Sequence, residues 1–328
     1  MAMEIKICKT TEWSEPIWNT YILAYNEVFG KGFQKEHFEH KYLRAGRGYS
    51  YHSLLKDADA GIVGGCTVIP CRYLRNMEEI WIGLAVDVFI REAWRTDPLM
   101  LRRMYMRLKT LLAAEGIAAV IAVPNAVAYP YWKTVVKWKD VGRLNYRMLP
   151  VRAGRILGKQ GFAGKALDAL SSIYTGCVRI FSGICLPFAG KAETQTYRYS
   201  ICEDDLYYVH KFSGPEYHRI EDVHTRIIYR IVNEDGVMTG YLLVAEENCM
   251  RTFRAFRSGV SAILCHKVDI ILYVGPTGFF QTLLLKVPKR FEPKILPMTC
   301  DLVSDDERYK DMYDIRNWDF GLKNYDVR

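Results

Sequence analysis

An apolar strand that runs directly into an amphipathic helix is the feature that most limits how this chain can fold. Residues 84–108 read LAVDVFIREAWRTDPLMLRRMYMRL, an apolar stretch followed by a short turn and then by apolar residues at helical spacing. The run IAAVIAVPN follows at 117–125, and its unbroken apolar character predicts a strand that is buried on both faces. Strand, turn, helix and strand in this order predict an α/β fold.

The same alternation continues on both sides of this stretch. In the first half we predict strands at 3–8, 49–55, 61–73, 80–90 and 144–151, and helices at 14–29, 35–43, 98–115 and 129–137. In the second half, the hairpin turn Asn233-Glu234-Asp235-Gly236 joins two strands. It is followed by a predicted helix at 253–264, a strand at 268–276, a helix at 279–286 and a strand at 295–303.

The second half therefore repeats the order of the first. At an offset of 151 residues, Val123-Pro124-Asn125 aligns with Val274-Gly275-Pro276, and Tyr129 aligns with Phe280. The length of 328 residues also suits about two domains. We predict an N-terminal domain at 1–151, a helical linker at 152–200 and a C-terminal domain at 201–328.

Composition excludes several classes of protein. The hydrophobic content of 50% and the charged content of 25% are those of a globular chain rather than a disordered one. The net charge of +8 suits a phosphate-bearing cosubstrate or an anionic membrane surface. The basic residues are scattered, and no basic face with stacking aromatics stands out, so we expect no DNA partner.

Cysteines and termini point to a reducing compartment. The nine cysteines are irregularly spaced and form no C-x-x-C pair, which argues against a disulfide framework and a zinc site. The N-terminus lacks the apolar core of a signal peptide, so we expect a cytoplasmic location. The apolar segment at 172–190 is short for a bilayer and is interrupted by Arg179, so a packed or interfacial helix is favoured over a membrane span.

Two histidine pairs have spacings that could suit metal binding. His37 and His40 form H-x-x-H beside acidic residues, and His218 and His224 flank Glu221. No third ligand is identifiable for either pair, so we expect solvated polar faces and no metal. The chain also lacks a Walker loop, a G-x-G-x-x-G turn and a G-x-S-x-G elbow.

Two stretches resemble the GNAT acyltransferase superfamily. They are VDVFIREAWR before the helix, and VIAVPNAVAYPYWKTVVKWKDVGRLNY, a buried strand ending in Pro-Asn and followed by an aromatic-rich helix. The resemblance covers residues 1–151, and the second half looks like the degenerate second domain of tandem-GNAT proteins. It implies two tandem GNAT-like domains with mixed, mostly antiparallel twisted sheets flanked by helices.

The resemblance implies an acyl-CoA site at the first strand, turn and helix. Val88, Phe89 and Ile90 match the strand that pairs with pantetheine, and Asn125 matches a polar position at the mouth of the next strand. The turn matches the pyrophosphate loop R-x-x-G-x-G/A, which adds the candidate ligand-binding residues Arg91, Arg95, Thr96, Leu99 and Met100. The cosubstrate implied is acetyl-CoA or another acyl-CoA.

The turn departs from the family pattern. Pro98 and Met100 stand where the loop glycines would be, and Pro98 has no amide to donate. Asp97 is a good helix cap whose carboxylate would take the amides that a pyrophosphate needs. Arginine side chains could neutralise a diphosphate instead, and the candidates are Arg91, Arg95, Arg102 and Arg103.

The catalytic candidates follow from the resemblance and from acyl-transfer chemistry. Tyr129 or Tyr131 lies on the helix that often supplies a tyrosine as acid to the CoA thiolate. Asp87 is a candidate base, although a structural hydrogen-bonding role is favoured. The terminal carboxylate of Arg328 matches the base of some tandem members.

The function implied is CoA-dependent N-acyl transfer, acetyltransferase-like, to a small amine or amino sugar. Two alternatives stay open. One is a catalytically inactive GNAT-fold protein that binds a ligand or partner, which Asp97-Pro98 favours. The other is a transferase that uses an aminoacyl-tRNA donor, with which the positive charge is compatible.

Overall fold

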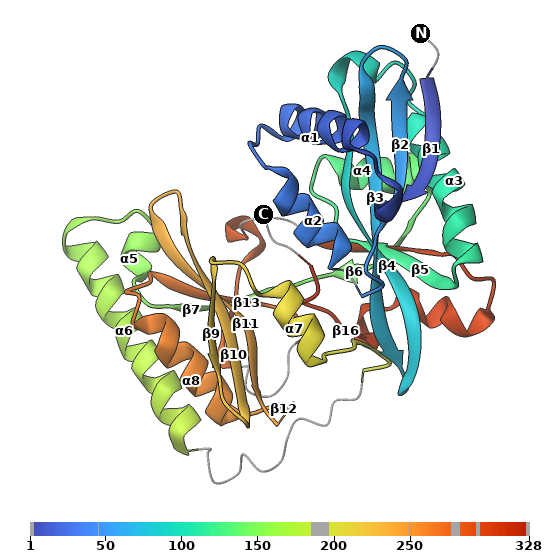
Figure 1. Ribbon diagram of the computed structural model, residues 1–328. Coiled ribbons are helices and arrows are strands. Elements are labelled where there is room, and N and C mark those ends of the chain that lie inside the picture. The colour runs from blue at the N-terminus through green and yellow to red at the C-terminus, as the bar shows by residue number, and fades with distance from the viewer. Residues whose placement is uncertain are drawn as a thin grey trace. The chain divides into compact units, whose positions relative to one another are not determined.

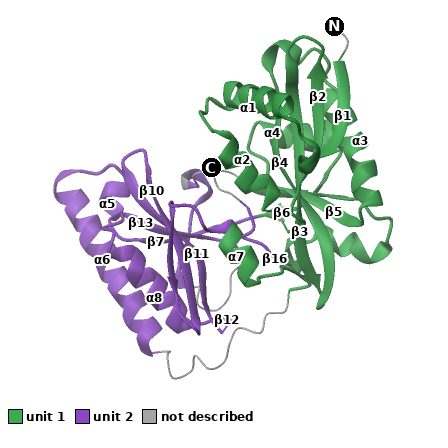
Figure 2. Ribbon diagram, viewed as in Figure 1, with its two compact units in different colours: residues 1–143, 197–210, 294–318 green, residues 144–196, 211–293, 319–328 purple. Residues whose placement is uncertain are grey.

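The chain folds into two compact units that interleave along the sequence. The computed structural model describes residues 3–44, 46–184, 197–248, 250–276, 283–292 and 296–325. Unit 1 comprises residues 1–143, 197–210 and 294–318, and unit 2 comprises residues 144–196, 211–293 and 319–328 (Figure 2). The sequence-based division at 1–151, 152–200 and 201–328 was consecutive, whereas each unit takes segments from both halves of the chain.

Unit 1 is built on one mixed sheet. Its main path runs in the order β1 (Met3–Lys9), β2 (Tyr51–Asp57), β3 (Gly61–Arg75), β4 (Glu78–Ile90), β5 (Ile117–Ala122), β15 (Pro297–Leu302) and β6 (Lys139–Arg143). Along this path only β4 and β5 are parallel. The short strand β8 (Tyr199–Ile201) pairs with the end of β3, and β16 (Trp318–Asp319) pairs with β8.

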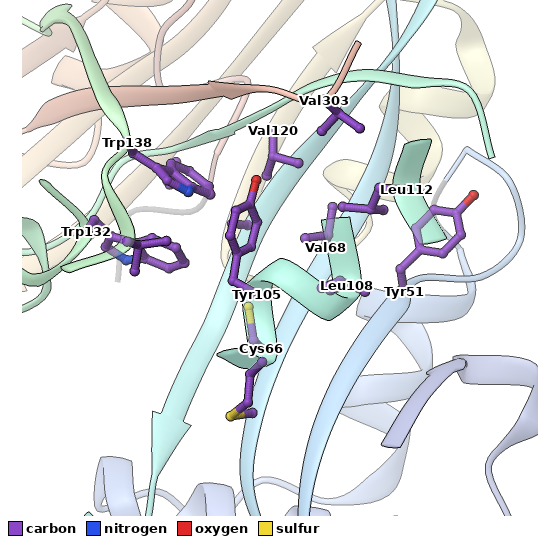
Figure 3. Packing of buried hydrophobic residues seen from close by; sticks show 14 of the residues in the cluster. Tyr51, Cys66, Val68, Tyr105, Leu108, Leu112, Val120, Trp132, Trp138 and Val303 are labelled. Carbon is purple, nitrogen blue, oxygen red and sulfur yellow. The ribbon is translucent and has the colours of Figure 1, made fainter. Parts of the chain in front are cut away.

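Helices cover both faces of this sheet (Figure 1). Helices α1 (Glu15–Phe29) and α2 (Lys35–Leu43) lie on one face, and α3 (Met100–Ala114) lies on the other. Neighbouring residues of β2 show the alternation, because Leu54 packs into the α1 core whereas Leu55 packs into the α3 core. In the α3 core, Tyr105 and Leu108 meet Val68, Val120 and the two indoles of Trp132 and Trp138 (Figure 3).

Unit 2 repeats the sheet order. Its path runs β14 (Leu285–Lys286), β7 (Tyr146–Pro150), β13 (Ile270–Val274), β11 (Val237–Glu247), β10 (Thr225–Glu234) and β9 (Tyr217–Glu221), with β12 (Met250–Arg251) beside β11. Here β11 and β13 are the parallel pair. Helices α8 (Phe253–Leu264) and α6 (Gly161–Ile184) pack against this sheet, after the short α5 (Ala153–Ile156) (Figure 1). Helix α7 (Asp205–Lys211), which precedes β9, belongs to unit 1 except for its last residue.

Strands are exchanged between the two halves of the chain. We predicted the strand at 144–151 as the last of the first half, but β7 pairs with β13 and β14 of unit 2. Conversely, β15 inserts between β5 and β6 of unit 1. Hydrophobic periodicity identified both strands correctly, but periodicity carries no information about which sheet a strand joins.

One predicted helix is corrected. Of the helix expected at 279–286, residues 279–282 lie outside the described residues, and Leu285–Lys286 form the strand β14, paired with Met148 and Arg147. The predicted helix at 129–137 is divided into a short α4 (Ala128–Tyr131) and a π-helical turn (Trp132–Val136), which ends at Lys137 in a left-handed conformation. Among the described residues, no helix has the length and apolarity needed to cross a membrane.

A glycine marks the same place in both parallel pairs. Gly83 of β4 lies opposite Val120, and Gly240 of β11 lies opposite Ile271, 151 residues after Val120. A Cβ atom on Gly83 would lie 2.4 Å from Val68 Cγ1, and one on Gly240 would lie 2.2 Å from Ile263 Cγ2. Val68 of the neighbouring strand β3 and Ile263 of helix α8 lie so close to the backbone at these two places that an added side chain would force them to move.

Candidate active site

The candidate site of unit 1 lies where β4 leaves β5. Their parallel pairing ends at Leu84 and Ile121, and from Ala85 to Ile90 the only described partner strand of β4 is β3. We call this stretch the β4 edge. The amide of Arg91 donates to Val63 O at 2.8 Å, so the peptide group of Ile90 points away from β3. The edge therefore presents backbone groups that an extended ligand can pair with.

A β-bulge in the middle of this edge aims Asp87 at the α1 and α2 face. The register shifts opposite Cys66, and Asp87 has a φ of 50°, which is uncommon for a residue with a side chain. Its carboxylate accepts hydrogen bonds from Lys41 Nζ at 2.7 and 2.9 Å, from the Tyr42 hydroxyl at 2.6 Å and from the Tyr25 hydroxyl at 3.4 Å. The side chain is only 7% exposed.

These donors define the chemistry that Asp87 can perform. Three donors stabilise the ionised carboxylate, and the Lys41 ammonium competes with any proton that Asp87 would accept. Asp87, with its charge offset by Lys41, is therefore suited to accept a hydrogen bond from a polar ligand rather than to act as a base. The rings of Tyr25 and Phe89, whose centroids are 5.8 Å apart, are apolar neighbours of this carboxylate.

A buried hydrogen-bonded network continues from Asp87 into unit 1. The Tyr42 and Tyr21 hydroxyls are 2.7 Å apart, Tyr21 is 3.4 Å from Thr67 Oγ1, and His52 joins Thr67 Oγ1 at 2.9 Å to Thr10 Oγ1 at 2.7 Å. Burial lowers the pKa of His52 to about 3, so its ring is neutral. Burial and the Asp87 charge raise the pKa values of both tyrosines.

No sequence pattern indicated this hydrogen-bonded network. Its members come from different elements, α1, α2, β2, β3 and the turn after β1, and no spacing between them marks a motif. Alternation in β2 and β3 indicates which residues face the α1 side. It does not distinguish a buried polar link from a core residue.

The predicted contact between Asp97 and the Leu99 amide is present, but Asp97 is not the N-cap of α3, because that position is taken by Leu99, which makes no side-chain capping bond. Asp97 Oδ1 accepts the Leu99 amide at 2.8 Å, and its other oxygen pairs with Arg103. Helix α3 begins at Met100 rather than at Pro98, because residues 98 and 99 form a turn. The Leu99 amide is therefore already used by a carboxylate at the position where the family resemblance places a pyrophosphate.

The arginines around the turn after β4 differ in how far their charge is already neutralised by other side chains, and so in how well they could bind a phosphate. Arg91 Nε contacts Glu27 Oε1 at 3.0 Å, and Arg95 Nε donates to the Ile90 carbonyl at 2.7 Å. Arg102 is exposed, and no ion pair joins it to another described residue. Ion pairs of exposed side chains are weak and can be exchanged for a ligand phosphate.

The two candidate tyrosines have different surroundings. The Tyr129 hydroxyl donates to Asp140 Oδ1 at 2.8 Å, and Lys133 contacts the same carboxylate. The Tyr131 hydroxyl donates to the carbonyl of Pro98, in the turn after β4, and burial raises the pKa of Tyr131. The structure thus brings Tyr131 to the turn, whereas Tyr129 is held by Asp140.

The other candidates have local structural contacts. Asn125 Oδ1 accepts the amides of Val127 at 3.1 Å and Ala128 at 2.8 Å, so it caps α4. Phe89 is buried among the aromatic rings of α1, and Val88 packs against the α3 core. Thr96 is exposed. Arg328 lies outside the described residues, and in the described part of the chain no group of three or more His, Cys, Asp or Glu is placed to hold a metal ion.

The corresponding edge of unit 2 is filled by the chain itself. The parallel pairing of β11 with β13 ends at Tyr241 and Leu272, and residues 242–245 form the β11 edge. Residues 319–325, which we call the C-terminal segment, lie here: the Leu322 amide donates to Val274 O at 3.2 Å. A Cβ atom on Gly321 would lie 2.6 Å from that carbonyl. The remaining cavity of about 20 Å³ has room for about one water molecule.

Four charged side chains fix the C-terminal segment to this edge. Arg251 pairs with Asp319, and Lys323 Nζ lies 3.2 Å from Asp319 Oδ2 and 3.6 Å from Glu246 Oε1. Burial alone would raise the pKa of Asp319, but the charges of Lys323 and Arg251 outweigh it and lower that pKa to about 2. Two positive and two negative charges thus compensate one another in a buried cluster.

Comparisons with known proteins agree on the fold. No protein-family model matches the sequence, and no curated protein matches it. Among solved structures, an Enterococcus faecalis protein described as a probable N-acyltransferase matches with a TM-score of 0.59, at 11% identity over 93% of this chain and 73% of that chain. A GCN5-related N-acetyltransferase from Anabaena variabilis matches with a TM-score of 0.55, at 13% identity over 91% and 73%.

A third similar structure carries an acyl-CoA ligand. Saccharomyces cerevisiae N-myristoyltransferase with bound myristoyl-CoA matches with a TM-score of 0.52, at 10% identity over 90% of this chain and 82% of that chain. These alignments span both units. The chain therefore has the GNAT fold, as two tandem units that each contain a mixed sheet flanked by helices.

Proposed function

We propose that the protein is an acyl-CoA-dependent N-acyltransferase whose single active site is the β4 edge of unit 1, and whose acceptor is a small amine or amino sugar. The observation that carries the proposal is the difference between the two edges. Beyond Leu84, β4 has β3 as its described partner strand, and the Ile90 carbonyl is held by the exposed side chain of Arg95, which a ligand can displace. In unit 2, the C-terminal segment lines the same small cavity as the β11 edge and bonds to Val274 of β13. Acyl transfer in neighbours of this fold supports the reaction class.

The residues around the β4 edge suit distinct parts of the reaction. The acceptor amine loses a proton to water and attacks the thioester carbonyl through its neutral nitrogen. The C–S bond breaks, the nitrogen releases a second proton to water as the amide forms, and the thiolate takes a proton. Tyr131 is our candidate for the donor of that proton. Burial raises the pKa of its hydroxyl, so the hydroxyl is protonated at neutral pH. Asp87, whose charge Lys41 offsets, would orient the acceptor by accepting a hydrogen bond from its amine N–H, which places the amine on the α1 side of β4.

A second candidate function follows from the turn. Asp97 occupies the Leu99 amide, and its negative charge opposes a diphosphate. This arrangement favours a donor that is not recognised through a CoA diphosphate, such as an aminoacyl-tRNA, or a binding protein without transfer activity. A comparison of acetyl-CoA with acetyl-pantetheine shows whether the diphosphate is recognised, because only acetyl-CoA contains the diphosphate.

The test is release of free thiol from acetyl-CoA or acetyl-pantetheine in the presence of a panel of amines and amino sugars. We expect release with at least one acceptor. For that acceptor, Tyr131→Phe should lower kcat by about a hundredfold, whereas the matched Tyr129→Phe should change it little. Binding of either thioester without thiol release from any acceptor would favour the binding protein. Equal loss in the two variants would remove Tyr131 as the acid.

A further inference from the structure

Helix α6 of unit 2 has its polarity reversed relative to an ordinary surface helix. Its buried face consists of small and hydroxyl residues, namely Gly164, Ser171, Thr175, Val178 and Ser182. The hydroxyls are satisfied by backbone carbonyls, Ser171 with Val151 O at 2.9 Å and Thr175 with Pro150 O at 3.0 Å. The large apolar residues therefore cannot be explained by packing on the sheet.

The opposite face of α6 carries large apolar side chains that are exposed. Their exposed fractions range from 44% to 90%, and the residues are Phe162, Leu170, Ile173, Ile180, Phe181 and Ile184. With 3.6 residues per turn, all six fall within an arc of about 100°. We call these six residues the α6 stripe. A continuous exposed apolar stripe of this kind marks an interaction surface.

Cations, and no exposed acid, accompany the stripe. Lys165 and Arg179 lie along one side of it on α6, and both are exposed. Asp168, the only acidic residue of α6, accepts the Gly154 amide at 2.7 Å and is half-buried. On the adjacent helix α8, the exposed guanidinium of Arg257 lies beside Gly183, 3.2 Å from where a Cβ would be. Helix α6 is thus apolar along its outer face and positive along its edge.

We propose that the α6 stripe lies on an anionic phospholipid surface, with α6 in the plane of the interface. An apolar face flanked by cations is the arrangement of interfacial helices, in which apolar side chains enter the acyl region and cations stay at the headgroups. A second copy of the chain is a poorer occupant. Two-fold packing on the stripe would bring the Lys165, Arg179 and Arg257 charges of both copies together.

Flotation of the full chain with vesicles tests this proposal. We expect binding to vesicles of phosphatidylcholine mixed with phosphatidylglycerol, weaker binding to phosphatidylcholine alone, and loss of the difference at high salt. The double variant Ile173→Ser/Ile180→Ser should weaken binding at least tenfold. The matched control Leu206→Ser/Val209→Ser, two exposed aliphatic residues of α7, should leave it unchanged.

The charged side of the stripe gives a second arm. Lys165→Gln and Arg179→Gln should each lower affinity for the anionic vesicles by about fivefold and leave binding to phosphatidylcholine unchanged. Absence of binding to anionic vesicles would overturn the proposal. Light scattering that shows a dimer of the wild-type chain, dissociated by the isoleucine variant, would also overturn it in favour of a second copy. Circular dichroism of every variant confirms that the fold is retained.

Discussion

The β4 edge of unit 1 and the β11 edge of unit 2 are the same structural feature in two conditions. Both follow a parallel pair that contains a glycine, Gly83 or Gly240, and both continue beyond the last paired residue. In unit 2 the C-terminal segment bonds to β13 and fixes itself with a buried charge cluster. This fold therefore provides a strand edge in each unit. Where a segment of the same chain lies against an edge, as in unit 2, that edge is not left for a ligand.

The polar groups near the two edges differ in the same sense. Unit 1 carries a neutral hydrogen-bonded network that ends at the Asp87–Lys41 pair, whereas unit 2 carries three ion pairs among four side chains of one buried cluster. The first arrangement leaves a carboxylate next to the edge for an acceptor. The second uses its charges to hold the C-terminal segment.

The largest effect is expected from breaking the charge cluster of unit 2. In Arg251→Met, the buried Asp319 keeps one cationic partner among the described residues, Lys323. Lys323 also contacts Glu246, so its charge is divided between two carboxylates. Removing one partner of a buried pair costs about 3–5 kcal/mol, so urea unfolding followed by far-UV circular dichroism should show a loss of this size. The exposed Arg254→Met, whose partner is Glu247, serves as the control and should cost less than about 1 kcal/mol. Equal losses would show that the cluster does not fix the segment.

Next in size are the two glycines of the parallel pairs. Gly83→Ala and Gly240→Ala should each cost about 1–3 kcal/mol of unfolding free energy, because the new Cβ overlaps Val68 or Ile263. All seven tryptophans lie in unit 1, so indole fluorescence reports its unfolding specifically. Gly32→Ala, with no atom within 4 Å of the added Cβ, is the control. If alanine lowered the free energy of unfolding at only one of the two glycines, the two parallel pairs would not be structurally equivalent.

Acid should act on the two units at different pH. His52 has a pKa of about 3 in the folded chain and about 6.5 when unfolded, so only the unfolded state gains a proton between these values. Stability is therefore full above pH 6.5 and falls by up to about 1.4 kcal/mol per pH unit below it. Asp319, with a folded pKa of about 2, contributes stability above its unfolded value of about 3.9 and loses it only as pH falls toward 2.

His52→Gln isolates the contribution of unit 1 to this pH dependence. The difference in unfolding free energy between wild type and variant, followed by tryptophan fluorescence from pH 7 to pH 4, should shrink steadily as pH falls. A difference that is constant over this range would mean that His52 is not held neutral by the fold.

The smallest expected effect concerns Asp97, in the turn before α3. Asp97→Gly removes a negative charge from the turn and releases Arg103 and the Leu99 amide, so it should tighten acetyl-CoA binding by about fivefold. Acetyl-pantetheine, which lacks the diphosphate, should bind both forms equally. Glu92→Gln, which removes an exposed acid from the same turn, is the charge-matched control. Weaker acetyl-CoA binding by Asp97→Gly would show that the Asp97 side chain supports the site.

Sequence patterns predicted the elements of this fold better than their partners. The apolar run at 117–125 and the helical spacing after Pro98 depend on local periodicity, so β5 and α3 were located correctly. The contact between Asp97 and the Leu99 amide also needed only neighbouring residues. By contrast, the exchange of β7 and β15 between the sheets depends on pairing between residues far apart in sequence, which no local pattern records.

The candidate site shows the same limit. The sequence singled out Asp87, but its partners Lys41 and Tyr42 come from a helix 45 residues away, so the ion pair could not be anticipated. Tyr129 and Tyr131 were equivalent in sequence. They were separated only by the contact of Tyr131 with Pro98, which depends on where α4 packs relative to the turn.

Isothermal titration of the full chain with acetyl-pantetheine shows how many strand edges accept a ligand, because acetyl-pantetheine lacks the diphosphate that the turn after β4 would contact. We expect one site per chain, because the β4 edge accepts a ligand and the C-terminal segment lies against the β11 edge. Cross-linking a photoreactive acyl-pantetheine should label unit 1 peptides near Ile90. Two sites per chain, no binding, or labelling confined to residues 242–245 of the β11 edge would contradict this expectation.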